Sequence, residues 1–267
     1  MFTLAEEFTE PDDTSRAAEY EQPLTERMRT FLRLEFLYQQ MLFHTETESD
    51  WSSRAAISSL LEITAILMRG DVRSEVMKEL ERQIELLRRY QSQPNVDAAR
   101  LQKLLDNLSQ LRTELGDTGP HYLQPIKDSE FLSAIKHRSA IPGGTCEFDL
   151  PDYSHWLRLP FRRRLTDLET WIRVMRPLCD TVMELMWLAR EGAVVEDRVA
   201  SSGMYQYSIS KDLRCRLLRV IVLPGCPFYP EISGSPQRFI IRFMQWSDTE
   251  NRAVQTQKDV KFQISTC

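Results

Sequence analysis

The chain has 267 residues, of which 42% are apolar and 27% charged, and its formal net charge is −5. These values are ordinary for a globular protein of one large or two small domains, and they exclude polyanion binding through overall charge. Five cysteines without a CxxC pair and four scattered histidines exclude a disulfide framework and show no zinc-ligand spacing. No metal or other cofactor is therefore expected.

The N-terminus has neither the basic nor the apolar region of a signal peptide, and no apolar run approaches the length of about 18 residues that a membrane span needs. The sequence therefore predicts a cytoplasmic protein without a membrane anchor. Residues 1–21 carry seven acidic side chains against the single Arg16, a net charge of −6. We predict a flexible acidic arm over residues 1–22.

Helical spacing begins at Pro23 and dominates as far as residue 140. A second helix is expected to start after Asp50 and to end before Gly70, and Asp71 is predicted to cap a third. The third and a leucine-rich fourth helix, closed by Gly116, should form an αα-hairpin, followed by a short helix at 128–138. We predict a helical domain over 23–140.

A turn is predicted at Pro142–Gly143, and the alternation of Cys146, Phe148 and Leu150 predicts a strand after it. A long helix is expected at about 161–191, kinked or split by Pro177 and packed, as part of 161–192, on the helical domain.

Strand patterns follow Gly203 at 205–209, 213–223, 237–246 and 258–264. We assign 141–160 and 200–267 to a β domain. The predicted fold class is therefore α+β, a helical bundle domain plus an antiparallel β-sheet or barrel-like domain.

Common catalytic signatures are absent: the sequence has no GxxxxGK[ST], GxGxxG, HExxH or GxSxG motif. A nucleophilic Cys146 with His155 as its base is conceivable, because the two lie close in sequence. A core cysteine and a surface histidine explain these residues equally simply, so we do not predict an enzyme.

The stretch QRFIIRFMQW, residues 237–246, places two arginines in an otherwise apolar strand. Side chains alternate along a strand, so Phe239, Ile241 and Phe243 should face the core. Arg238 and Arg242 then share the other face, about 13 Å apart, with Ile240 between them. Guanidinium groups bind carboxylates through two hydrogen bonds, so this face suits a ligand that is both acidic and apolar.

A second basic cluster, Arg162–Arg164, opens the long helix, where cations oppose the helix dipole. A solvated helix start is one explanation. The alternative is a nucleic-acid-binding β-domain protein with these arginines on phosphates. The acidic arm and the nearly neutral remainder of the chain argue against nucleic-acid binding.

Four stretches resemble the ZapD family of bacterial cell-division proteins, and they occur in the family's order. They are PLTERMRTFLRLEFLYQQ (23–40), GDVRSEVMKELERQ (70–83), IPGGTCEFDLPDYSHWLRLP (141–160) and YPEISGSPQRFIIRFM (229–244). The arm at 1–19 is longer and more acidic than the family's usual start, and QPIKDSEFL (124–132) matches poorly.

The resemblance implies a symmetric homodimer with a helical and a β domain. It also implies a non-enzymatic role at the mid-cell division ring, where family members bind the C-terminal tail of FtsZ and bundle its filaments. The family's tail-binding residues map onto Arg33, Arg238 and Arg242, with Arg29 and Arg138 as near neighbours of such positions.

Overall fold

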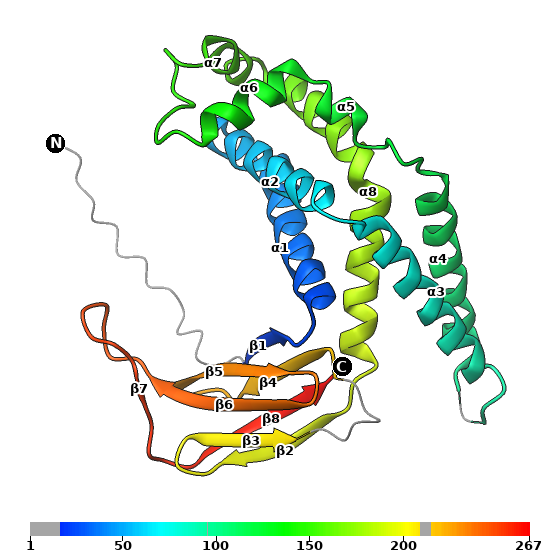
Figure 1. Cartoon of the computed structure of the whole chain (residues 1–267), viewed down its shortest axis with the longest axis vertical. Coiled ribbons are helices and arrows are strands. Elements are labelled where there is room, and N and C mark those ends of the chain that lie inside the picture. Colours follow the sequence, from blue (N-terminus) through cyan, green and yellow to red (C-terminus); the bar gives the residue numbers. More distant parts are fainter. Residues whose placement is uncertain (1–16, 95, 209–214) are drawn as a thin grey trace. The chain divides into compact units, whose positions relative to one another are not determined.

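The computed structural model describes residues 17–94, 96–208 and 215–267, which form two compact units (Figure 1). The helical unit is Thr30–Leu188. The β unit consists of the described residues of Met1–Arg29 and Ala189–Cys267. Helices and antiparallel strands thus lie largely in separate units, which confirms the predicted α+β class.

The helices are α1 (Glu26–Glu46), α2 (Asp50–Met68), α3 (Val72–Tyr90), α4 (Ala98–Asp117), α5 (Gln124–Lys127), α6 (Glu130–Ser139), α7 (Pro151–Leu157) and α8 (Phe161–Glu191). Side-chain caps fix several of their starts. Asp71 accepts a hydrogen bond from the backbone N–H of Ser74 at 3.2 Å, so α3 begins where the sequence predicted. The helix predicted at 128–138 begins instead after Ser129, whose hydroxyl accepts from the N–H of Leu132.

Helices α3 and α4 pack against each other as the predicted hairpin. Val76, Leu80 and Ile84 of α3 are buried. Five leucines of α4 are also buried, namely Leu101, Leu105, Leu108, Leu111 and Leu115. The leucine stripe therefore serves packing within the chain.

Helix α8 continues through Pro177 as one helix, so the alternative of two separate helices is wrong. The hydroxyl of Thr181 donates to the carbonyl oxygen of Pro177 at 2.7 Å. Leu168 and Met175 on this helix are fully buried. Most of α8 belongs to the helical unit.

A buried polar contact joins α1 to α8. The hydroxyl of Tyr38 donates to the carboxylate of Asp180 at 2.7 Å. Burial, and secondly this hydrogen bond, raises the pKa of Tyr38 above its ordinary range. Burial also raises the pKa of Asp180, and the bond to Tyr38 opposes that rise. The hydroxyl of Tyr38 and the carboxylate of Asp180 thus satisfy each other's hydrogen bonding where α1 meets α8.

The strand predicted at 146–150 is wrong. These residues form turns, and Pro151 then opens helix α7. Gly143 has φ +71°, and a Cβ on Gly144 would lie 2.4 Å from the carbonyl oxygen of Arg138, so tight turns replace an extended chain here. Residues 141–160 consequently belong to the helical unit and not to the β unit to which we assigned them.

The strands are β1 (Ala18–Pro23), β2 (Val195–Ala200), β3 (Met204–Ser208), β4 (Leu217–Val222), β5 (Phe228–Ser235), β6 (Arg238–Gln245), β7 (Val254–Gln255) and β8 (Val260–Thr266). The first sheet has the order β1-β4-β8-β2, and the second has the order β3-β6-β5 with β7 also paired to β6. The described strands thus form two open antiparallel sheets and not a closed barrel. Residue 209 and residues 213–214 of the predicted strands lie outside the described residues.

The β unit has an apolar core to which both sheets contribute. The predicted inward row of β6, Phe239, Ile241 and Phe243, is buried, which confirms the alternation. Alternate residues of β8, namely Val260, Phe262 and Ile264, are buried as well, and the rings of Phe243 and Phe262 lie 5.1 Å apart. The opposite faces of these strands therefore point away from the core.

The predicted flexible arm over residues 1–22 is wrong at its end, because β1 pairs with β4 from Ala18 onward. Residues 1–16 lie outside the described part of the chain. Glu19 forms an ion pair of 2.6 Å with Arg219, and Glu21 one of 2.8 Å with Arg190. Hydrogen bonds and ion pairs thus fix the start of the described chain to the first sheet.

Candidate functional site

The outer face of β6 carries the arginines that the sequence singled out. Arg238, Ile240, Arg242 and Met244 alternate with the buried residues of this strand, and we call these four the arginine row. Arg238 and Arg242 are exposed, whereas Ile240 and Met244 are partly buried. The row therefore presents two cations with apolar surface beside them.

Strand pairing defines the surroundings of the row, because directly paired residues share a face. Arg242 lies between Met204 of β3 and Glu231 of β5. Arg238 lies between Ser208 and Ser235. Arg242 therefore has an acidic and an apolar neighbour, whereas Arg238 has two small hydroxyl neighbours.

Both guanidinium groups of the row are available to a ligand. Among the residues that the structure describes, neither Arg238 nor Arg242 forms a side-chain hydrogen bond or an ion pair, even though Glu231 is opposite Arg242. Arg219 of β4, by contrast, is bonded to Glu19 and Glu21. The arginines of β6 thus differ from an arginine that serves the fold.

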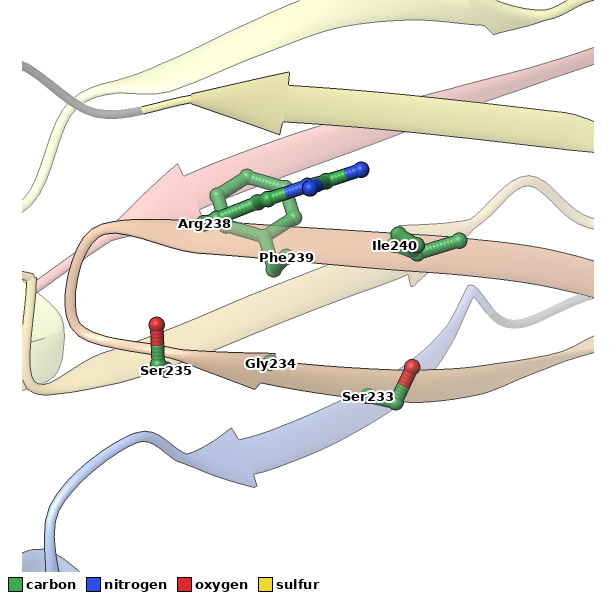
Figure 2. A pocket seen from close by; sticks show the side chains of 6 residues that line it. All are labelled: Ser233, Gly234, Ser235, Arg238, Phe239 and Ile240. Atoms are coloured by element: carbon green, nitrogen blue, oxygen red, sulfur yellow. The ribbon is translucent and has the colours of Figure 1, made fainter.

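A shallow hollow of about 260 Å³ lies at the Arg238 end of the row. Figure 2 shows its lining on the β5–β6 hairpin: Ser233, Gly234, Ser235, Arg238, Phe239 and Ile240. A guanidinium group, two hydroxyls and the aliphatic side chain of Ile240 together suit a carboxylate carried next to an apolar group. Ser233 and Ser235 were not among the predicted site residues, although the polar Glu231, Ser233 and Ser235 alternate with less polar residues in the manner of a strand.

Gly234 holds the two strands of this hairpin close together. A Cβ at this position would lie 2.6 Å from the Cβ of Phe239 and 2.8 Å from the carbonyl oxygen of Arg238. We expect Gly234→Ala to push β5 away from β6 and to lower the free energy of unfolding by about 1–3 kcal/mol. Urea unfolding of the variant checks this, with Gly119→Ala as control because a Cβ there meets no atom within 4 Å. Equal stability of both variants would contradict the close approach.

The structure separates the other predicted site residues into two kinds. Arg33 of α1 is exposed and, among the described residues, forms no ion pair. Arg29 instead pairs with Glu26 at 3.5 Å, and Arg138 pairs with Asp149 at 3.4 Å. Arg33 and Arg138 belong to the helical unit, so only Arg238 and Arg242 are placed on one shared face.

The basic cluster that supported a nucleic-acid site is not a surface cluster of three. Arg164 is buried, and its guanidinium group donates to Asp50 at 2.7 Å and to Ser53 at 3.0 Å. Arg163 pairs with Asp167 at 3.8 Å. The interpretation of Arg162–Arg164 as three phosphate ligands is therefore wrong for Arg164.

The structure does not join the conceivable nucleophile to its base. The thiol of Cys146 donates to Asp149 at 3.5 Å, and His155 is exposed on α7. Over the described ranges no hydrogen bond links Cys146 to His155.

No group of three His, Cys, Asp or Glu side chains among the described residues could hold a metal ion. None of the described helices is long and apolar enough to cross a membrane.

Comparison with known proteins gives a consistent picture. The family profile described as ZapD, cell division protein, matches residues 32–242. The cell division protein ZapD of Methylococcus capsulatus (strain Bath) is 35% identical over 248 residues, which cover 93% of this chain and 97% of that protein. The matched region of the family profile includes Arg33, Arg138, Arg238 and Arg242.

Proposed function

The chain belongs to the ZapD family of cell division proteins, and from this premise we propose that it is a non-enzymatic cross-linker of FtsZ filaments. It binds the C-terminal tail of FtsZ through the arginine row and bundles the filaments at the division ring in the cytoplasm at mid-cell. It acts as a symmetric homodimer and needs no cofactor.

The observation that carries this proposal is the pair of exposed guanidinium groups on β6 that have no partner among the described residues. β6 is the central strand of its sheet, so its backbone holds the two groups about 13 Å apart. An unstructured tail that combines carboxylates with apolar side chains fits this spacing. Arg238 and Arg242 take the carboxylates, and Ile240 and Met244 contact the apolar groups.

The energetics favour a weak single contact that is strengthened by repetition. A charge-assisted hydrogen bond contributes about 1.5–3 kcal/mol, so two such contacts give a modest affinity. A filament presents many tails, and a homodimer presents two arginine rows related by a twofold axis. Linked binding of this kind raises the apparent affinity by about 10²–10⁴ without any new contact.

Titration of the purified full-length protein with a synthetic FtsZ tail peptide tests this function. The screening length falls from about 10 Å at 0.1 M salt to about 3 Å at 1 M salt. We therefore expect clear binding at the lower salt concentration and a large loss at the higher one. Absence of binding at low salt would exclude the arginine row as the tail site.

Glu231 should weaken an anionic ligand, because its carboxylate is opposite Arg242 on the same face. Glu231→Gln removes this repulsion and the competition for the guanidinium group. We expect the variant to bind the tail peptide about two- to five-fold more tightly, as expected for a cross-strand charge effect of up to about 1 kcal/mol. Glu81→Gln on α3, an exposed acid of the helical unit, is the matched control and should bind like the parent.

A further inference from the structure

The N-terminal segment, residues 1–16, has a charge pattern that matches the arginine row. It contains EEFTE at residues 6–10. In an extended chain Glu6, Phe8 and Glu10 share one side, with the carboxylates about 13 Å apart. The row presents Arg238, Ile240 and Arg242 at the same spacing. The acid–apolar–acid pattern of Glu6, Phe8 and Glu10 thus has the same spacing as the cation–apolar–cation pattern of the arginine row.

From this match we propose that residues 6–10 bind the arginine row of their own chain and compete with its external ligand. The carboxylates of Glu6 and Glu10 bind the guanidinium groups of Arg238 and Arg242, in either direction along the strand. Phe8 packs on Ile240. The proposal names the regulation of the tail site and in that respect rests on the proposed function.

The point of attachment makes this contact feasible. The segment continues into β1, which is fixed to β4 and belongs to the same unit as the arginine row. Sixteen residues extend to at most about 55 Å, whereas a domain of about 100 residues has a radius of gyration of about 13 Å. The segment therefore reaches the row without any movement between the two units.

Charge assignment separates this segment from the acids that follow it. Glu19 and Glu21 already pair with Arg219 and Arg190, so they do not compete for the row. Arg238 and Arg242 have no ion pair among the described residues. The acids of residues 6–10 therefore match the arginine row in charge, whereas Glu19 and Glu21 are already paired elsewhere.

Competition of this kind weakens the apparent affinity by a calculable factor. A short tether gives an effective concentration on the order of 1 mM. If the segment alone binds with a dissociation constant of about 0.1–1 mM, the row is occupied half of the time or more. The apparent affinity for an external tail then falls about two- to ten-fold.

The first experiment tests the contact without FtsZ. A fluorescent peptide of residues 1–16 is titrated into the full-length Glu6→Gln/Glu10→Gln protein, whose own segment no longer competes. We expect submillimolar binding, at least about ten-fold weaker binding when the peptide carries E6Q/E10Q, and little change when it carries D12N/D13N. Equal loss of affinity with both altered peptides would show that only net charge acts, and it would overturn the proposal. Undiminished binding of the unaltered peptide to a protein that also carries Arg238→Gln/Arg242→Gln would overturn it as well.

The second experiment measures the affinity of full-length variants for the FtsZ tail peptide. E6Q/E10Q should bind two- to ten-fold more tightly than the parent, and D12N/D13N should bind like it. Tail binding that is unchanged by E6Q/E10Q overturns the competition and leaves the proposed function intact. If the peptide of residues 1–16 binds as expected and the FtsZ tail does not bind to any variant, the contact stands and the proposed function fails.

Discussion

Charge reversal of both exposed arginines of β6, Arg238→Glu with Arg242→Glu, is expected to abolish co-sedimentation with FtsZ filaments and leave the fold intact. The two side chains have no ion pair or hydrogen bond among the described residues, so their loss removes no described internal contact. At Arg238 such a surface substitution changes the free energy of unfolding by about 0.5 kcal/mol or less. Arg242→Glu adds repulsion by the opposite Glu231, which costs up to about 1 kcal/mol. Both costs are small against the total stability of about 5–15 kcal/mol of a typical domain. Binding, in contrast, loses two charge-assisted contacts and gains repulsion. A loss of at least about 3 kcal/mol weakens the affinity more than about 100-fold.

The matched control is Lys261→Glu. Lys261 is exposed on β8 of the first sheet and precedes the buried Phe262, so it points away from the core on the other sheet. Its reversal changes the charge of the same unit without altering the arginine row, and bundling should persist. Parent-like bundling by the Arg238→Glu/Arg242→Glu variant, or an equal loss in the control, would refute the site.

Removal of Asp50, the partner of a buried arginine, should give the largest loss of stability among the ion pairs described above. Arg164 is 5% exposed and donates to Asp50 and Ser53, which ties α8 to the start of α2. Asp50→Ala leaves the guanidinium group buried without a carboxylate, which costs about 3–5 kcal/mol in comparable sites. Because Asp50 itself is more than half exposed, we expect a value near the lower limit, about 3 kcal/mol.

Urea unfolding measures this effect, and two further variants isolate its cause. Glu85→Ala removes an exposed partner of Arg89 and should cost about 0.5 kcal/mol or less. Arg164→Met replaces the buried cation by an apolar side chain and leaves an Asp50 that water reaches. It should therefore cost less than Asp50→Ala. Similar stability of the Asp50→Ala and Glu85→Ala variants would contradict this prediction, because water would then replace the carboxylate as the partner of the Arg164 guanidinium group.

Helices were easier to predict than strands in this chain, for a physical reason. Helical boundaries follow from residues close in sequence, such as Asp71 and its bond to Ser74, and the buried stripes repeat within each helix. The alternation in β1 is short, with only Ala18 and Tyr20 alternating with glutamates. Pairing with β4 and ion pairs to Arg219 and Arg190 stabilise this edge strand. Those partners are far away in sequence, so no local pattern reveals them.

The predicted strand at 146–150 failed because alternation alone does not distinguish an extended chain from successive turns. The close approach of Gly144 to Arg138 and the start of α7 at Pro151 determine the outcome. For the candidate site, the period of two correctly placed Arg238 and Arg242 on one face. The positions of the Ser233 and Ser235 hydroxyls beside Ile240 and Arg238 follow from the register between β5 and β6, which no local sequence pattern specifies.

The central position of β6 has a consequence for how its ligand is recognised. β5 pairs along its whole length, and on the other side β3 and β7 pair with all but Phe243, whose backbone N–H and carbonyl bond to Gly203 and Thr256. A bound peptide therefore cannot form backbone hydrogen bonds with this strand and is recognised through its side chains alone. Without backbone pairing, the site does not select the N-to-C direction of the peptide. A tail synthesised in reverse order should bind about as well as the natural one, provided that the interval between its carboxylates is kept.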